Sequence, residues 1–210
     1  MKTHLTYLIT LLAFTAGNFV LASEQDETPD VLDTTGNIQF PEQFDDTPGP
    51  LSELDKNLVL SAYKGQLAEV KIYVKKGADV NLQDQKKRTP LIFAASAGHT
   101  PVVEYLIDAG ADVSMHDSDG KTALLHACKR SFNETAALLI EHGADVNFQS
   151  TKDGMTALMI AAVWDNTELV EILLDHGADP DVTDAFGRTA RLLAEMKGNT
   201  AVLGMLPDSP

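Results

Sequence analysis

Cysteine and basic residues are scarce in this sequence of 210 residues. Cys128 is the one cysteine, so no disulfide can form within the chain, and the folded state has to be stabilised by packing. Lysine and arginine number 16 against 31 aspartates and glutamates, which gives a formal net charge of -15 at pH 7. A chain this acidic repels phosphate, and we therefore expect no nucleic acid among its partners.

Long hydrophobic runs are also lacking, apart from one near the N-terminus. Lys2 precedes an apolar run over residues 5–14, and small or aliphatic residues lead up to Ala22. The run is shorter than the roughly 20 residues that a spanning helix needs, and its pattern is typical of a secretory signal peptide. We predict a signal peptide over residues 1–22, with an uncleaved anchor as the alternative. The mature chain is then exported and has no membrane attachment.

The predicted location after export is the periplasm of a bacterium, with an extracellular location as the alternative. The signal segment alone fits a bacterial or a eukaryotic export route. Because the mature chain has no disulfide, we favour the periplasm.

Motifs of enzyme active sites are lacking as well. The sequence has no nucleophile elbow, no phosphate-binding Gly-Lys-Ser/Thr loop, no zinc-binding helix motif and no dinucleotide fingerprint. His142 and His176 each precede a Gly-Ala-Asp triplet, which places them beside the negative end of a helix rather than in a metal site. We predict that the protein is not an enzyme and has no catalytic residue, no cofactor and no metal.

An acidic segment follows the predicted signal peptide. Residues 23–50 contain eight acidic residues, no basic residue, four prolines and two glycines. This composition buries too little apolar surface to fold by itself, so we predict a disordered linker. Residues 38–40 and Phe44 interrupt its polarity and could anchor it on a groove.

The rest of the chain repeats itself at intervals of 33, 33 and 34 residues, marked by glycines that each open a Gly-Ala-Asp triplet: Gly77, Gly110, Gly143 and Gly177. Threonines at positions 89, 122, 156 and 189 keep nearly the same interval. One unit starts with Thr-Pro, continues as an apolar helix ended by Gly98, and closes with a second helix. Two short helices and a turn cannot bury their apolar face alone, so neighbouring repeats must supply the core.

This pattern resembles the ankyrin repeat family, whose consensus combines Gly-x-Thr-Pro-Leu-His with Gly-Ala-Asp-Val-Asn. The resemblance covers about Leu54 to Leu206. It implies an all-α fold, an ankyrin-repeat solenoid of about five helix-turn-helix repeats with β-hairpin-like fingers. The implied repeat domain covers residues 51–210, with atypical repeats at both ends, and its repeats span about 54–84, 85–117, 118–150, 151–184 and 185–206. Apolar side chains replace the consensus histidine, so apolar packing must substitute for its hydrogen bonds: Ile92, Leu125, Met159 and Leu192.

Two fingers depart from the pattern. Lys87 stands where later fingers have Gly120, Gly154 and Gly187. Because a left-handed backbone costs a lysine roughly 1 kcal/mol or more, we expect a departure from the standard hairpin turn there. One extra residue between Val146 and Gly154 lengthens the third finger.

Two further predictions concern the helices. Cys128 aligns with Ala95 and Ala162, so we predict a small buried side chain rather than a reactive thiol. The second helices of the regular repeats open at Thr100, Asn133 and Thr167, whose side chains we expect to cap the first turn.

The resemblance implies that partners bind the concave side, which the fingers and the ends of the first helices form. Ten of the fifteen basic residues after Ala22 map to this side, so we expect a basic concave face on an acidic protein. Trp164, the one tryptophan, takes a position that is Lys64, Ala97, Arg130 or Lys197 in other repeats, so packing does not require it. The predicted partner-binding residues are Tyr63, Lys64, Lys86, Arg88, Lys121, Lys129, Arg130, Met155, Val163, Trp164, Phe186 and Arg188.

Within this set we predict a binding hot spot formed by Arg130, Met155, Val163 and Trp164, because tryptophan and arginine dominate binding energies at interfaces. The alternative is that Trp164 packs locally against Met155 and Val163.

We therefore expect an exported protein that binds a partner protein through its basic and aromatic concave face. The partner is an acidic surface on a separate protein, or the chain's own acidic segment 23–50 through self-association. Within this class the protein is an immunity-type inhibitor of a toxic hydrolase or an accessory factor for a periplasmic enzyme. Other classes that stay open are a structural spacer and an enzyme whose site these motifs do not reveal.

Overall fold

The computed structural model of the protein describes residues 52–207, so the predicted signal peptide and the acidic segment 23–50 lie outside the described residues. The described part contains ten α-helices and no strand, and the predicted all-α fold is confirmed. None of these helices has the length and apolar character that crossing a bilayer requires. In chain order they are α1 (Glu53–Tyr63), α2 (Leu67–Lys75), α3 (Pro90–Ser96), α4 (Thr100–Asp108), α5 (Ala123–Lys129), α6 (Asn133–Glu141), α7 (Ala157–Val163), α8 (Thr167–Asp175), α9 (Ala190–Lys197) and α10 (Thr200–Leu203).

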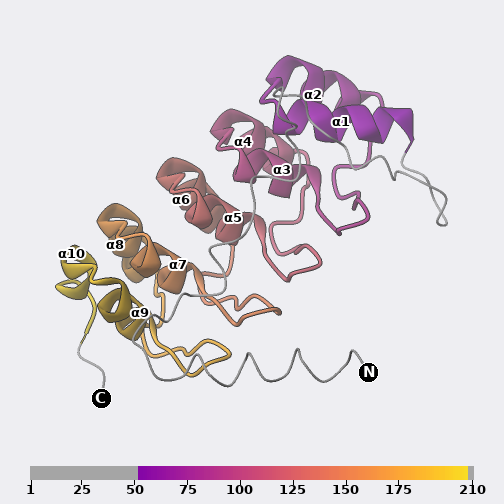
Figure 1. Cartoon of the computed structure of the whole chain (residues 1–210). Coiled ribbons are helices and arrows are strands. Elements are labelled where there is room, and N and C mark those ends of the chain that lie inside the picture. Colours follow the sequence, from indigo (N-terminus) through magenta and orange to yellow (C-terminus); the bar gives the residue numbers. More distant parts are fainter. Residues whose placement is uncertain (1–51, 208–210) are drawn as a thin grey trace, which may run out of the picture. The chain divides into compact units, whose positions relative to one another are not determined.

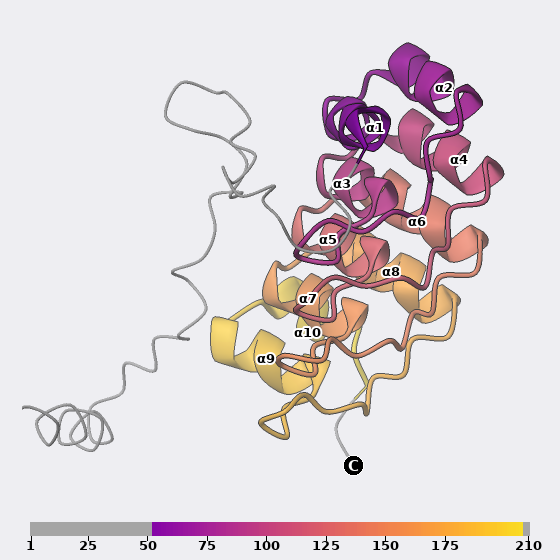
Figure 2. The same cartoon turned by 90° about the vertical axis from the view of Figure 1, so that its right-hand side faces the viewer.

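The helices form five pairs that stack in chain order (Figure 1). The first helices α1, α3, α5, α7 and α9 pack in one row, and the second helices form a row beside them (Figure 2). Between pairs the chain leaves the helices in four long loops that project to the same side (Figure 1). We call these loops finger 1 (83–88), finger 2 (116–121), finger 3 (149–155) and finger 4 (183–188). This is the predicted stack of five helix-turn-helix repeats.

A threonine starts each first helix after α1. The hydroxyl oxygen accepts a hydrogen bond from the amide three residues later, at 3.2, 3.4, 3.3 and 3.2 Å for Thr89, Thr122, Thr156 and Thr189. Such a cap satisfies one of the amides that the first turn of a helix leaves unpaired. Ser52 caps α1 in the same way.

The capping prediction for the second helices was wrong. Thr100, Asn133 and Thr167 are the first helical residues of α4, α6 and α8 rather than their N-caps. The hydroxyl of Thr100 lies 2.9 Å from that of Thr135, and the side-chain amide of Asn166 donates to Asn133 at 2.7 Å. Because the neighbouring repeat offers these partners, the side chains of Thr100 and Asn133 link repeats instead of capping their own helices.

The core between repeats pairs a leucine with a small residue four positions later, on the same side of the helix. These pairs are buried: Leu91 with Ala95, Leu124 with Cys128, and Leu158 with Ala162. Burial raises the pKa of the Cys128 thiol to about 12, so Cys128 is the small buried side chain that the alignment predicted.

The last repeat replaces this pair by Arg191 and Glu195, which form an ion pair at 3.2 Å. Arg191 also donates to the main-chain oxygen of Leu206 at 2.9 Å. A polar outer surface is what a terminal repeat needs where no further repeat covers it. For the same reason Leu192 is 40% exposed, whereas its counterparts in earlier repeats are buried as predicted: Ile92, Leu125 and Met159.

Three fingers are closed by an aspartate. One of its carboxylate oxygens accepts the amide hydrogen of the residue four positions later, at 2.7, 2.8 and 2.9 Å in the pairs Asp84–Arg88, Asp117–Lys121 and Asp184–Arg188. In finger 3, where Ser150 replaces the aspartate, its hydroxyl accepts the amide of Met155 at 3.1 Å. The main-chain amide of Ser150 also donates to the main-chain oxygen of Met155 at 3.0 Å. The extra residue of finger 3 therefore lies in the turn between these two residues, and the finger is closed like the others.

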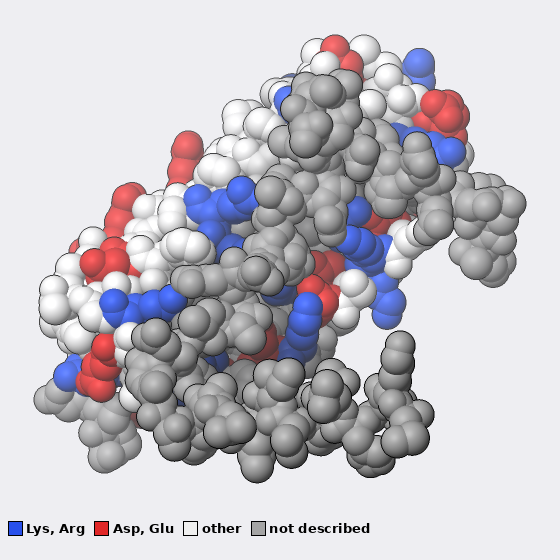
Figure 3. Space-filling model, in the orientation of Figure 1, with Lys and Arg blue, Asp and Glu red and all other residues white. Residues whose placement is uncertain are grey.

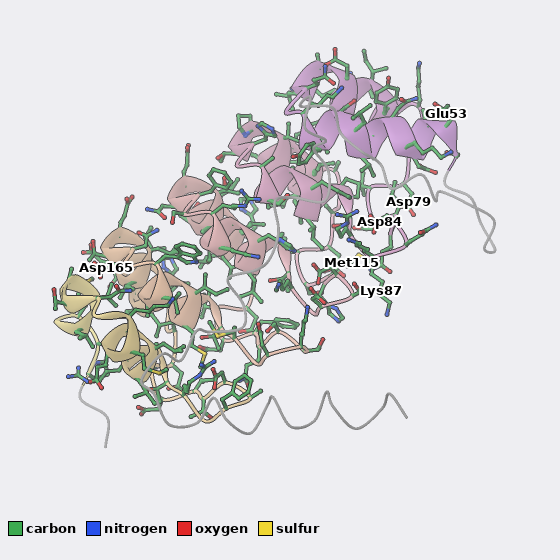
Figure 4. All side chains as sticks on the ribbon, in the orientation of Figure 1. Glu53, Asp79, Asp84, Lys87, Met115 and Asp165 are labelled. Atoms are coloured by element: carbon green, nitrogen blue, oxygen red, sulfur yellow. The ribbon has the colours of Figure 1, made fainter. Side chains whose placement is uncertain are left out.

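Lys87 keeps the standard turn, so the expected departure was wrong. Its φ of 58° is the left-handed conformation that Gly120 and Gly187 adopt, at 75° and 73°. Its amide donates to the main-chain oxygen of Asp84 at 2.9 Å, as that of Gly120 donates to Asp117. The bonds to Asp84 therefore hold a lysine in a glycine conformation, and Figure 4 shows Lys87 at the outer end of finger 1.

Candidate protein-binding face

The fingers and the ends of the first helices form one continuous surface. The guanidinium of Arg88 in finger 1 lies 4.5 Å from the ring centroid of Phe93 in α3, and His126 in α5 reaches Asp117 in finger 2 at 2.8 Å. The residues three and four positions after Phe93 and after His126 lie on the same side of the helix as these two side chains. We call the fingers and these helix-end pairs the inner face; the pairs are Tyr63 and Lys64, Ser96 and Ala97, Lys129 and Arg130, Val163 and Trp164, and Met196 and Lys197.

Two predicted binding residues stabilise their own fingers. Arg88 forms an ion pair with Asp84 at 2.7 Å, and Arg188 pairs with Asp184 at 2.6 Å. The guanidinium of Arg188 also lies 4.8 Å from the ring centroid of Phe186. Burial acts to raise the pKa of Asp184, but hydrogen bonds from Arg188 outweigh it and hold that pKa below the usual range. Because each arginine is already paired with an aspartate of its own finger, it attracts an acidic partner less strongly than an unpaired arginine would.

Lysines in the middle fingers are also paired. Lys121 lies 3.8 Å and Lys152 3.4 Å from the carboxylate of Asp119, so this aspartate joins fingers 2 and 3. The main-chain amide of Lys152 donates to the main-chain oxygen of Asp119 at 3.2 Å. Lys121, one of the predicted binding residues, thus lies within a small charge network.

Finger 2 is held to the stack by an imidazole. Where fingers 1 and 4 use an arginine, finger 2 has Lys121, and Nε2 of His126 lies 2.8 Å from the carboxylate of Asp117. Burial acts to raise the pKa of Asp117, but hydrogen bonds from His126 and from the amides of Lys121 and Asp119 leave it below its usual value. The prediction missed this contact, although His126 at the helix position of Phe93, together with Lys121 at the position of Arg88, was a signal for it.

The ends of the first helices carry the exposed predicted residues. Lys64, Arg130 and Trp164 are the C-cap residues of α1, α5 and α7, and Ala97 is that of α3, so these four residues occupy one equivalent position in successive repeats. Lys64 and Arg130 are exposed, and the side chain of Trp164 is 59% exposed. More than half of Trp164 is therefore available to a partner, whether or not the rest of its ring packs locally.

The other predicted residues divide by burial. Lys86 in finger 1 is exposed, and Phe186 at the tip of finger 4 is 74% exposed. The half-buried residues are Tyr63, Lys129, Met155 and Val163. The ring of Tyr63 meets that of Phe93 edge-on, with the ring centroids 6.3 Å apart. Met196, 47% exposed at the end of α9, and Lys87 are exposed inner-face residues that the predicted set left out.

Charge separates the inner face from the second helices of repeats two to four. Helices α4, α6 and α8 contain acidic residues and no lysine or arginine. Figure 3 shows basic atoms over α5 and at finger 1, and acidic atoms at the outer edge of α6 and α8. Among residues 52–207 no group of three or more histidine, cysteine or carboxylate side chains lies close enough to hold a metal ion. His142 and His176 instead lie 2.8 Å from main-chain oxygens in the last turns of α6 and α8, as predicted for helix ends.

Stacked helix pairs with fingers on one side define a solenoid of repeats, a class of proteins that uses extended surfaces to bind partners. A family described as ankyrin repeats, in three copies, matches residues 58–150, 109–184 and 147–208. The chain therefore belongs to the ankyrin repeat family, whose repeats are modules for interaction between proteins and in general not enzymes. No curated protein matches the sequence.

Proposed function

We propose that this is an exported protein that binds a partner protein through its inner face. The observation that carries the proposal is the exposure of Trp164 at a position where other repeats have lysine, alanine or arginine. Burying an exposed aromatic side chain is favourable, and tryptophan and arginine are the residue types that contribute most to binding between proteins. Arg130, at the same position one repeat earlier, supplies the matching cation.

The partner in this proposal has an acidic surface. The acidic helices α4, α6 and α8 repel such a surface, whereas the inner face attracts it and raises the rate of encounter. Attraction of this kind weakens as salt is added, which distinguishes it from purely apolar association.

The acidic segment 23–50 is the second candidate for the same face. It carries eight negative charges on the same chain, so its effective concentration is high and it competes with a separate partner. Deleting residues 23–50 then raises partner affinity at low salt. An unchanged affinity rules out this competition.

Export to the periplasm is part of the proposal and rests on the signal-peptide pattern of residues 1–22. Mass spectrometry of the protein from the exported fraction of its host tests it: a mature chain that begins at Ser23 supports export. Recovery of the intact N-terminus from the cytoplasm contradicts it, and recovery outside the cell favours an extracellular protein.

The proposal is tested by comparing what four forms of the full chain capture from the exported fraction of the host. Wild type and an Ile72→Ala/Lys75→Ala variant, altered on the exposed side of α2, should retain the same protein. An Arg130→Ala/Trp164→Ala variant of equal folded stability should lose it, as should a Lys129→Glu/Arg130→Glu variant. Equal capture by all four contradicts the proposal and leaves the structural spacer.

An immunity-type inhibitor and an accessory factor are distinguished by the partner's own activity. Addition of the purified protein lowers the activity of a hydrolase that it inhibits and raises that of an enzyme that it supports. Turnover by the purified protein alone, retained in Trp164→Ala, would instead indicate an enzyme.

A further inference from the structure

Cations without an internal partner lie at one end of the inner face. Lys64, Lys87 and Arg130 are exposed and form no ion pair within residues 52–207. They belong to the first three repeats. Across the fingers and helix ends of these repeats, seven bases face three acids: Lys64, Lys86, Lys87, Arg88, Lys121, Lys129 and Arg130 against Asp84, Asp117 and Asp119.

Exposed apolar side chains lie at the other end. Trp164, Phe186 and Met196 are 59%, 74% and 47% exposed, and all three belong to the last two repeats. Over the same parts of these repeats the charges nearly balance, with three bases against two acids: Lys152, Arg188 and Lys197 against Asp153 and Asp184. The inner face therefore changes from cationic to apolar along the stack.

The change from cationic to apolar character occurs between two equivalent positions of neighbouring repeats. Arg130 and Trp164 are the C-caps of α5 and α7, one repeat apart. Packed helices lie about 8–10 Å apart, and an extended chain advances about 3.3 Å per residue, so one repeat corresponds to about three residues of an extended ligand. A ligand side chain over Arg130 and another over Trp164 are thus about three positions apart.

We propose that the inner face binds an extended segment of a separate partner protein in which a carboxylate and a large apolar side chain lie about three residues apart. The carboxylate pairs with Arg130 and the apolar side chain covers Trp164, while further acidic residues extend toward Lys64 and Lys87. This deepens the proposed function and rests on it. Helices α4, α6 and α8, which contain acidic residues and no lysine or arginine, repel such a segment from the second helices of the middle repeats, and the change from cationic to apolar along the inner face sets its direction.

The test is selection of short random peptides on the immobilised full chain, followed by titration of the enriched peptides. Trp164 is the one tryptophan, so its fluorescence reports contact at this position directly. Enriched peptides are expected to contain an acidic residue and an aromatic or large aliphatic residue about three positions apart. Their affinity should fall about 5- to 10-fold in Arg130→Ala and about 30-fold or more in Trp164→Ala, and stay unchanged in Lys75→Ala and Ile72→Ala.

Register is tested by charge exchange. Replacing the peptide's acidic residue by lysine should abolish binding to wild type and restore it in Arg130→Glu, whose fold is checked by its unfolding midpoint. Enriched peptides that depend on inner-face residues but lack the acidic and apolar pair overturn this inference and leave the proposed function standing. Peptides that bind all variants equally overturn both.

Discussion

Within residues 52–207, three residues adopt a left-handed backbone without being glycine: Lys87, Ser131 and Asp165, with φ of 58°, 56° and 52°. Asp165 has a structural reason, because its carboxylate accepts the main-chain amide of Val202 at 3.3 Å and so ties α7 to α10. Ser131 ends α5 where Gly65 and Gly98 end α1 and α3. For a side chain with a Cβ atom this conformation costs about 1–2 kcal/mol.

Replacement by glycine removes that strain. We expect Ser131→Gly and Lys87→Gly each to raise the free energy of unfolding by up to about 1 kcal/mol, measured by urea denaturation, since the greater freedom of glycine in the unfolded chain offsets part of the gain. If Lys87 contributes to partner binding, Lys87→Gly should both stabilise the fold and weaken the binding of the partner. Loss of stability in both variants would contradict the strain argument.

The thiol of Cys128 should be inert in the folded protein. It is buried, and burial raises its pKa to about 12, so almost no reactive thiolate is present at neutral pH. We expect a thiol reagent to label Cys128 only as the protein unfolds, with a denaturant dependence that follows the unfolding curve. Rapid stoichiometric labelling in native buffer would show that the thiol is accessible.

Asparagine side chains join successive repeats at the ends of the Gly-Ala-Asp triplets. Asn81 donates to Gly110 O at 3.0 Å and accepts from the amide of Asp112 at 2.8 Å, and Asn147 makes the same two bonds to Gly177 and Asp179 at 3.1 and 2.8 Å. In the second repeat the position is Ser114, and its hydroxyl donates to Asp112 of its own repeat at 2.6 Å. The junction between repeats two and three thus lacks this bridge.

We expect Ser114→Asn to supply the bridge and raise the free energy of unfolding by about 1 kcal/mol, since each hydrogen bond contributes roughly 0.5–1.5 kcal/mol. Asn147→Ser is the matched control and should lower it by about the same amount. Thermal and urea unfolding of the two variants against wild type measure both effects. A neutral or destabilising Ser114→Asn would mean that the loop at this junction cannot accept the longer side chain.

The contact between Asp117 and His126 in finger 2 makes the free energy of unfolding depend on pH in the acid range. The pKa of Asp117 in the folded protein lies below its usual value, so its stabilising contribution is complete above the unfolded pKa of about 3.9 and is lost as pH falls through the folded pKa. We expect Asp117→Asn to lower the free energy of unfolding by about 1–3 kcal/mol at neutral pH and to flatten its fall below about pH 4.

The control for finger 2 is Glu171→Gln, at an exposed position of α8, which should leave the acid profile unchanged. A Lys121→Arg/His126→Phe variant transfers the arrangement of finger 1 and should retain most of the stability at neutral pH. An Asp117→Asn profile that parallels wild type would contradict the contribution of this carboxylate.

The helix pairs could be predicted from sequence because their signals are local and periodic. The recurring threonines and Gly-Ala-Asp triplets locate the repeats, and the alignment of Cys128 with two alanines predicts its burial. The finger contacts could not be predicted in this way, because they depend on side chains that meet across a loop. From the sequence, Arg88 and Arg188 were predicted to be cations that bind a partner. In the structure they form ion pairs with Asp84 and Asp184 within the fingers.

At the scale of the molecule, charge is unevenly distributed. Of the second helices, α4, α6 and α8 are acidic, whereas α2 also has the exposed lysines Lys71 and Lys75; exposed cations lie together with exposed aromatics on the inner face. The apolar core between repeats needs neither feature, since it is made by residues such as Leu124 and Ala162 at other helix positions. The stack therefore does not need this distribution of charge for its stability, and the proposed binding of an acidic partner gives it a role.

Site-specific photo-crosslinking in intact host cells tests the central claim most directly. A photoreactive amino acid at position 97 lies in the row of Lys64, Arg130 and Trp164 without removing any of them, and the same amino acid at position 72 reports the exposed side of α2. We predict a crosslink to one partner protein from position 97, its loss when Arg130→Ala/Trp164→Ala is added, and none to that protein from position 72. Crosslinks to the same protein from position 72 alone would contradict the account.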